Sequence, residues 1–160
     1  SRGLGDVYKR QLLSEAGLPG VADPGRDWVA AAHARGHAVQ VLPGASSITL
    51  AVAGSGLQGQ SFAFVGYLPV EAAERRTRIQ ALEQTSRRLQ QTQVLIETPY
   101  RNPAVWEALV TGLPPTARLS VSVALTTPGG YTLSRRVQDW RREPVVIPDR
   151  LPAVFCLQAA

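Results

Sequence analysis

Short apolar runs and longer amphipathic segments alternate along the chain. Residues 12–13 resemble the end of a buried strand, and residues 27–35 predict an amphipathic helix that Gly36 can terminate. Residues 38–42 predict a short strand of the parallel type, and residues 45–55 predict a second helix. The order strand, helix, strand, helix is typical of a layered α/β fold.

A stretch rich in Gly, Ser and Gln at residues 54–60 interrupts this pattern, and we interpret it as the boundary between two lobes. The pattern then resumes, and its longest helix is arginine-rich on one side. The expected strands are 62–65, 94–96, 119–125, 131–133 and 154–157. The expected helices are 71–90, 104–111 and 136–141, the last of them capped by Ser134.

The first residues do not continue this pattern. The chain contains no methionine, and only the last few residues of segment 1–11 resemble a strand entering a loop. We therefore expect residues 1–11 to be a non-native tail, with further native residues upstream of this chain. Residues 12–58 would be the remainder of an N-terminal α/β lobe, and residues 59–160 a C-terminal α/β lobe.

The composition narrows the class of protein. Hydrophobic residues make up 44% and charged residues 18% of the chain, as in globular proteins. No apolar run approaches the roughly 20 residues of a membrane helix, and the N-terminus lacks a signal-peptide pattern. Cys156 lies in an apolar run, where we expect it to be buried, and as the single cysteine it fits a reducing compartment. We expect a cytoplasmic protein with no membrane partner.

The chain is basic, with a net charge of +5, and 16 of its 17 basic residues are arginine. Arginine suits phosphate recognition, although a compositionally biased genome gives the same excess. The charge falls to +3 without residues 1–11, which is a mild indication of an anionic partner. The arginines of the long helix can track RNA phosphates or form a solvated face. They are Arg75, Arg76, Arg78, Arg87 and Arg88.

Two further groups of residues invite a structural interpretation. His33 and His37 have a spacing that can chelate a metal, but no third ligand accompanies them, so we expect a solvated helix end and no metal site. Each of the three tryptophans falls in a helical segment, where we expect it to pack. They are Trp28, Trp106 and Trp140.

Two loops that follow predicted strands are candidates for a ligand site. They are residues 14–25 (SEAGLPGVADPG) and residues 43–47 (PGASS). Open α/β sheets bind ligands beyond the carboxyl ends of their strands. Gly17 and Gly20 allow a ligand to approach the main chain, and the helix start after Pro43 offers N–H groups to a carboxylate. An ordinary surface loop and a plain capping serine are the alternatives.

Four motifs, in order, give the chain a resemblance to a known family. EAGLP with DPG (residues 15–25), followed by LPGASS (residues 42–47), resembles the paired loops of the tetrapyrrole-methylase superfamily. FVGYLP (residues 64–69) and ETPYR (residues 97–101) resemble the F-x-G-F-L-P and E-S-P-H-R segments of the ribosomal RNA small subunit methyltransferase I family. The resemblance covers nearly the whole chain after its first residues.

This resemblance implies the two-lobed α/β fold of the class III methyltransferases, with an incomplete N-terminal lobe. It implies S-adenosylmethionine (SAM) as the cofactor, bound between the lobes of a homodimer. That family methylates the 2′-hydroxyl of a cytidine in 16S rRNA, so ribosomal RNA or the small ribosomal subunit would be a partner. The residues that it implies for the SAM site are Ala16, Gly17, Leu18, Val21, Ser46, Ser47, Thr98, Leu125 and Gly130.

The candidate catalytic residues are Glu97, Tyr100 and Arg101. Methyl transfer from a sulfonium requires alignment above all, and positioning can supply roughly 7–11 kcal/mol. We expect Glu97 to position the acceptor or take up its proton, with Tyr100 and Arg101 on the substrate side. The alternative for Glu97 and Arg101 is a structural ion pair that braces the loop.

The chain also departs from the family pattern. Leu18 stands where D-A-G-T-P has a polar residue, Tyr100 replaces the histidine of E-S-P-H-R, and LTTP (residues 125–128) replaces acidic and basic residues. The SAM prediction stands because much of that contact is through the backbone. The acceptor stays open between ribosomal RNA and a small molecule of the tetrapyrrole type, and a non-catalytic SAM- or RNA-binding module is a third hypothesis. Because the first strand and its loop are expected upstream, we expect these 160 residues alone to bind SAM weakly or not at all.

Overall fold

The computed structural model describes residues 11–160, so all but the last residue of the predicted tail 1–11 lies outside the described residues. The chain forms two compact units, Ser1–Ser46 and Ser47–Ala160. The helix that follows residue 46 belongs to the second unit, although the sequence suggested a division near residue 58. That lobe boundary stays a prediction.

The first unit contains one helix, α1 (Arg26–Ala34), among its described residues, close to the predicted span. Gly36, with φ +74°, follows the helix as expected, and the N–H of His37 bonds back to Ala32. The strands expected at residues 12–13 and 38–42 are not formed. Both predictions were wrong. Neither segment pairs with a strand among residues 11–160, and a lone strand leaves its backbone groups unpaired.

The packing expected of Trp28 is also wrong. Its side chain is 77% exposed, and α1 contains no buried residue. The amphipathic pattern of α1 is real, but among the described residues of its own unit no apolar layer covers it.

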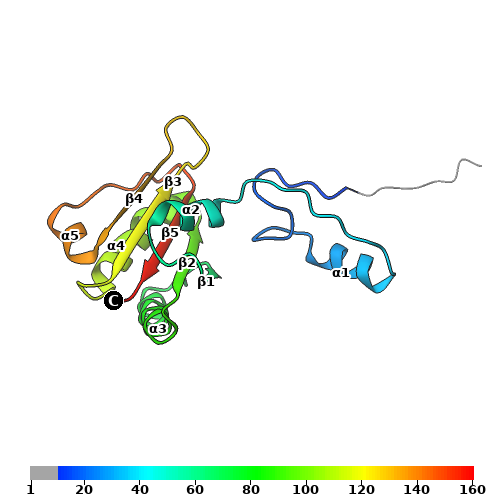
Figure 1. The fold of residues 1–160 in the computed structure, drawn as a ribbon. Helices are drawn as coiled ribbons and strands as arrows, with labels where there is room; N and C mark the ends of the chain where they lie inside the picture. The colour runs from blue at the N-terminus through cyan, green and yellow to red at the C-terminus, as the bar shows by residue number, and fades with distance from the viewer. Residues whose placement is uncertain (1–10) are drawn as a thin grey trace, which may run out of the picture. The chain divides into compact units, whose positions relative to one another are not determined.

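The second unit is built on a five-stranded sheet (Figure 1). Its strands are β1 (Phe62–Gly66), β2 (Thr92–Glu97), β3 (Arg118–Val123), β4 (Tyr131–Arg136) and β5 (Ala153–Gln158), in the spatial order β1-β2-β5-β3-β4. β1 and β2 are parallel, and β5 runs antiparallel to both β2 and β3. All five strands were predicted. β3 stops before its expected end because Ala124 adopts a left-handed φ of +48°.

Helices cover both faces of this sheet. α2 (Ser47–Ser55) packs on one face through Ile48, Ala51 and Val52. The opposite face holds the larger core with α3 (Ala72–Leu89), η1 (Pro99–Arg101), α4 (Asn102–Gly112) and α5 (Val137–Arg142). The helices α2, α3, α4 and α5 match the predicted spans within a few residues, and η1 was not predicted. Ser134 does not cap α5, because it lies inside β4 opposite Ser120.

The larger core confirms the packing role of two tryptophans. The rings of Trp106 and Trp140 meet edge to face at 5.0 Å, and Trp140 Nε1 donates to the carbonyl of Leu119 at 2.9 Å. On the other face, Cys156 is buried, as predicted, and burial raises the pKa of its thiol to about 12. None of the helices among residues 11–160 is long and apolar enough to cross a membrane.

Candidate functional site

The strand directions bring several predicted site residues to one edge of the sheet. Glu97, at the carboxyl end of β2, is paired with Ala153, which is paired in turn with Val123 at the carboxyl end of β3. β1 runs parallel to β2, so its carboxyl end lies at the same edge. We call this the carboxyl edge, and it is where open α/β sheets place their ligands.

The FVGYLP motif turns the chain at the end of β1. The register with β2 slips between Phe64 and Gly66, and Gly66 has φ +74°, a conformation that glycine adopts without a steric cost. The turn buries Leu68, which is 3% exposed, and leaves Tyr67 exposed. The backbone carbonyls of Leu68 and Pro69 then face the neighbouring motif.

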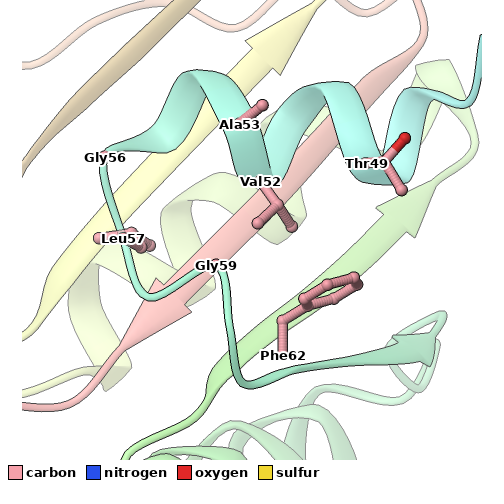
Figure 2. A pocket seen from close by; sticks show the side chains of 7 residues that line it. All are labelled: Thr49, Val52, Ala53, Gly56, Leu57, Gly59 and Phe62. Atoms are coloured by element: carbon pink, nitrogen blue, oxygen red, sulfur yellow. The ribbon is translucent and has the colours of Figure 1, made fainter.

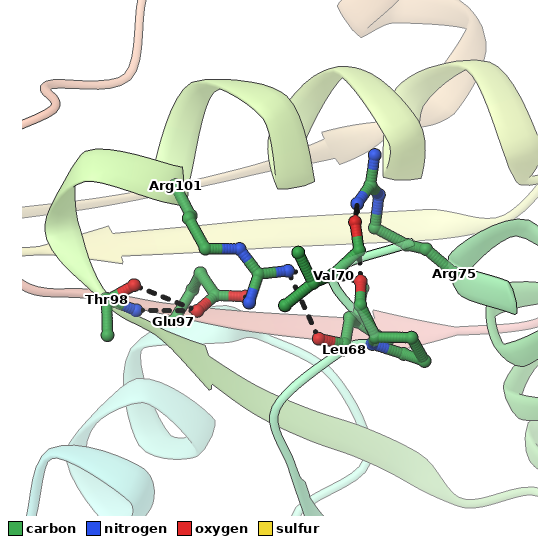
Figure 3. Close-up of polar contacts among 7 residues, drawn as sticks. Leu68, Val70, Arg75, Glu97, Thr98 and Arg101 are labelled. Carbon is green, nitrogen blue, oxygen red and sulfur yellow. Dashed lines mark hydrogen bonds and ion pairs between the residues drawn. The ribbon is translucent and has the colours of Figure 1, made fainter. Parts of the chain in front are cut away.

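The ETPYR motif at the end of β2 binds those carbonyls (Figure 3). Arg101 donates to the carbonyl oxygens of Leu68 at 3.2 Å and Pro69 at 3.1 Å, and its Nη1 lies 3.2 Å from Glu97 Oε2. The other oxygen of Glu97 accepts from the backbone N–H of Thr98 at 2.8 Å and from its hydroxyl at 3.2 Å. The Glu97 side chain is 1% exposed.

This arrangement bears on the two hypotheses for Glu97. A proton acceptor needs a free oxygen within reach of the acceptor hydroxyl. Oε1 of Glu97 accepts two hydrogen bonds from Thr98. Oε2 accepts no hydrogen bond, but it is buried and lies in the ion pair with Arg101, so no acceptor hydroxyl reaches it in this arrangement. The geometry favours the structural alternative, in which Glu97 and Arg101 brace the two loops. Tyr100 is 75% exposed and so stays available to a substrate.

A second arginine supports the same turn from α3. Arg75 donates to the carbonyls of Pro69 at 3.2 Å and Val70 at 2.7 Å (Figure 3). From the sequence, Arg75 was expected to belong to a basic helix face. In the structure its guanidinium group instead donates to backbone carbonyl oxygens. α3 itself begins after Glu71, whose side chain accepts from the N–H of Glu74 at 2.8 Å. Hydrogen bonds from the backbone N–H groups of Ala73 and Glu74 lower the pKa of Glu71.

The loop after β3 completes the carboxyl edge. Ala124 and Thr126 both have left-handed φ angles, and the Thr127 hydroxyl donates to the Ala124 carbonyl at 2.8 Å. Gly130 closes the loop so tightly that an added Cβ would overlap that carbonyl. Leu125 is half-buried against the small core under α2. The loop therefore holds Leu125 and Gly130, two predicted SAM-site residues, in a fixed backbone.

The first unit holds the remaining loop residues in a glycine-rich turn. Gly17 and Gly20 have φ angles of +74° and +79°, and a Cβ added at either would meet no atom within 4 Å. Their main chain is therefore open to a ligand. The N–H of Val21 bonds to the carbonyl of Leu18 at 3.1 Å. Ala16 and Val21 are exposed.

The two predicted loops of the first unit lie next to each other. A Cβ added at Gly44, in the PGASS loop, would lie 3.4 Å from Cδ2 of Leu18. Ser46 is buried and Ser47 is exposed at the first position of α2. In the second unit, the far end of α2 lies near Arg118 at the opposite edge of the sheet, so Ser47 begins the helix at the carboxyl edge.

The predicted residues thus fall into two groups, each within one unit. Ala16, Gly17, Leu18, Val21 and Ser46 belong to the first unit. Ser47 and the residues of the carboxyl edge belong to the second. Sequence reasoning missed the carbonyls of Leu68 and Pro69 as partners of Arg101, because the contact spans more than 30 residues and involves no side chain of theirs.

An apolar pocket of about 430 Å³ lies between α2 and the start of β1 (Figure 2). Its lining residues are Thr49, Val52, Ala53, Gly56, Leu57, Gly59 and Phe62. None of these is a predicted site residue, and none is charged. Ligand sites for polar cofactors need a few placed polar groups, so this pocket is a poor candidate for the SAM site. Within the described part of the chain, no three His, Cys, Asp or Glu residues are grouped to hold a metal ion.

Comparisons with known proteins identify the family of the chain. The family described as Tetrapyrrole (Corrin/Porphyrin) Methylases matches residues 9–139. A relative named "Ribosomal RNA small subunit methyltransferase I" from Halalkalibacterium halodurans is 41% identical over 90 residues, which cover 56% of this chain and 30% of the relative. One of the same name from Synechocystis is 36% identical over 115 residues, covering 72% of this chain and 40% of the relative. The chain thus spans well under half the length of these relatives.

Solved structures show the same fold at lower identity. The methyltransferase CobJ has a TM-score of 0.56 at 19% identity, over 90% of this chain and 62% of that chain. Uroporphyrin-III C-methyl transferase from Thermus thermophilus, complexed with S-adenyl homocysteine, has a TM-score of 0.51 at 22% identity, over 89% and 62%. The predicted α/β fold and the predicted branch, similar to ribosomal RNA small subunit methyltransferase I, are both confirmed. The chain belongs to the tetrapyrrole (corrin/porphyrin) methylase family.

Proposed function

We propose that the protein carrying this chain transfers a methyl group from SAM to a ribose 2′-hydroxyl of small-subunit ribosomal RNA. The observation that carries the proposal is the carboxyl edge, where the FVGYLP and ETPYR turns are joined through Arg101. By these motifs the chain resembles the ribosomal RNA small subunit methyltransferase I family, and the two relatives reported above carry the name "Ribosomal RNA small subunit methyltransferase I".

The donor site that we propose combines backbone and small side chains. The main chain at Gly17 is open and suits close approach of a ligand, and the first turn of α2 at Ser47 offers backbone N–H groups to a carboxylate. Each of these two features by itself suits one part of a nucleoside that bears an amino-acid tail. The full proposed set is Ala16, Gly17, Leu18, Val21, Ser46, Ser47, Thr98, Leu125 and Gly130.

The residues of the chain contribute positioning. Bound SAM supplies a sulfonium methyl group with an activated leaving group. Arg101 and Glu97 fix the two turns, which sets where Thr98 faces the donor and where exposed Tyr100 meets the acceptor. Such fixed geometry can lower a barrier by roughly 7–11 kcal/mol when the reacting atoms are held in line. In this proposal Glu97 and Arg101 are positioning residues.

Three further parts of the proposal rest on the family resemblance. The working form is a homodimer, its location is the cytoplasm, and its partner is ribosomal RNA or the small ribosomal subunit. Two alternatives remain. Methylation of a small tetrapyrrole-type molecule is favoured only by the fold shared with CobJ and the uroporphyrin enzyme. In the second alternative, the protein has the same fold and binds SAM or RNA, but it transfers no methyl group.

Ribose-methylation mapping of 16S rRNA tests the proposed substrate. We expect one cytidine to lose its 2′-O-methyl group when the gene is deleted and to regain it when the intact gene is restored. An unchanged map in the deletion strain would contradict the ribosomal RNA assignment. A lost methyl group that returns with a Tyr100→Phe variant but not with a Tyr100→Ala variant would place the ring of Tyr100 at the acceptor.

A further inference from the structure

Two arginines face each other at the edge of the sheet opposite to the carboxyl edge. Arg118 begins β3 and is paired directly with Arg136, which ends β4. On its other side Arg118 is paired with Gln158 of β5. Residues directly opposite on paired antiparallel strands project from the same face, so all three side chains share the face that α2 covers.

No ion pair among residues 11–160 includes Arg118 or Arg136, and both residues are exposed. Like charges directly opposite each other destabilise a sheet, so the pairing of Arg118 with Arg136 has an energetic cost that no ion pair in the described part of the chain offsets. Other arginines of this unit are differently placed: Arg101 and Arg135 each meet a glutamate.

The two arginines line a pocket of about 380 Å³ whose side chains are rich in hydrogen-bond donors. Gln158 also lines it, and the side-chain oxygen of Gln158 already accepts from the backbone N–H of Gln58 at 3.0 Å, which leaves its NH₂ group to the pocket. None of the lining residues has an acidic side chain. The complete lining is Gln90, Thr116, Arg118, Arg136, Gln158, Ala159 and Ala160.

A purely structural role explains only part of this arrangement. A Cβ added at Gly56, just beyond the end of α2, would lie 3.8 Å from Arg118 Nη2. A cation there stabilises the negative end of the helix dipole, which gives Arg118 a reason to be basic. Arg136 has no such contact in the described part of the chain. Together with Gln158, the pair lines one pocket with planar donor groups of the kind that bind phosphate oxygens.

We propose that this pocket, which we call the arginine-pair pocket (Arg118, Arg136 and Gln158), binds a phosphodiester group of RNA. It lies at the far edge of the sheet from the proposed methyl-transfer site, so it would anchor the RNA chain at a distance from the reacting nucleotide. This inference depends on one part of the proposed function, namely that the substrate is RNA. The pocket would bind RNA of any base sequence, because contacts to phosphate position a nucleic acid but do not distinguish its bases.

Salt-dependent RNA binding tests the pocket. We compare the parent protein, the double variant Arg118→Gln/Arg136→Gln and the matched control Arg35→Gln/Arg142→Gln, which removes the same charge from two exposed residues outside the pocket. The probe is a short fluorescein-labelled single-stranded RNA of mixed sequence. For the pocket variant, the slope of log K against log salt concentration should fall by about 0.7 for each RNA phosphate that the protein no longer neutralises. The control should keep the parent slope.

The outcomes separate this inference from the proposed function. An unchanged slope in the pocket variant, or an equal fall in the control, would overturn the inference, since only general charge would then attract RNA. An Arg118→Lys/Arg136→Lys variant should keep most of the slope, because the slope counts neutralised phosphates. SAM binding should stay at the parent level in every variant. The ribose-methylation map of the deletion strain decides the proposed function independently of these slopes.

Discussion

Replacing Arg101 by methionine should lower the free energy of unfolding by about 3–5 kcal/mol. The substitution keeps most of the side-chain volume but leaves the Glu97 carboxylate, whose side chain is 1% exposed, without its cation. The two donors of Thr98 remain and cannot replace a full charge. Urea unfolding followed by tryptophan fluorescence measures the loss, since Trp106 and Trp140 lie in the core of the same unit.

The matched control is Arg142→Met. Arg142 pairs with Asp139 at 4.0 Å, and both side chains are substantially exposed, so its loss should cost no more than about 1 kcal/mol. The double variant Glu97→Gln/Arg101→Met should recover much of the stability, because no buried charge is left unpaired. Equal costs for Arg101→Met and Arg142→Met would contradict the bracing role and return Glu97 to the candidates for proton acceptance.

Replacing Gly130 by alanine should destabilise the second unit by about 1–3 kcal/mol. The added Cβ would overlap the carbonyl oxygen of Ala124 and lie 2.9 Å from its carbon, and backbone atoms cannot move aside as a flexible side chain can. The neighbouring Gly129→Ala is the control, since a Cβ there meets no atom within 4 Å. The control should change stability by no more than about 0.5 kcal/mol.

The same pair of variants tests the proposed site. If Gly130 lies at the SAM site, Gly130→Ala should weaken SAM binding in protein that is still folded, whereas Gly129→Ala should not. Equal thermal midpoints for the two variants would show that the loop adopts another conformation. The claim that the loop holds Leu125 in a fixed backbone would then be contradicted.

Hydrophobic periodicity predicted the sheet of the second unit because its central strands β2, β5 and β3 are buried and its edge strands β1 and β4 are mostly half-buried. The same reasoning failed at residues 38–42, where an apolar run pairs with no strand in the part of the chain that the structure describes. It failed again at Trp28, since a pattern reports which face could be buried and not what covers it. Ser134 was misassigned because its pairing with Ser120 outweighs a capping preference that is purely local.

The motifs of the candidate site could be predicted from the sequence, but their arrangement in space could not. The spacing of Glu97 and Arg101 allowed both an ion pair and a catalytic pair, and the choice depended on carbonyls more than 30 residues away in the chain. The opposition of Arg118 and Arg136 likewise follows from strand register, which turn residues and packing set jointly. Local sequence could name these residues, but tertiary structure was needed to pair them.

The central claim is that the open glycine turn of the first unit approaches a SAM molecule. Calorimetric titration of SAM into the longest natural protein that contains this chain tests it most directly, with Gly17→Ala compared against Gly36→Ala. Both glycines have φ +74°, and at both an added Cβ meets no atom within 4 Å, so the two substitutions carry equal backbone strain. We expect one SAM site per chain, lost or weakened at least about tenfold, or 1.4 kcal/mol, by Gly17→Ala alone. Absence of SAM binding, or equal affinity in the two variants, would contradict the claim.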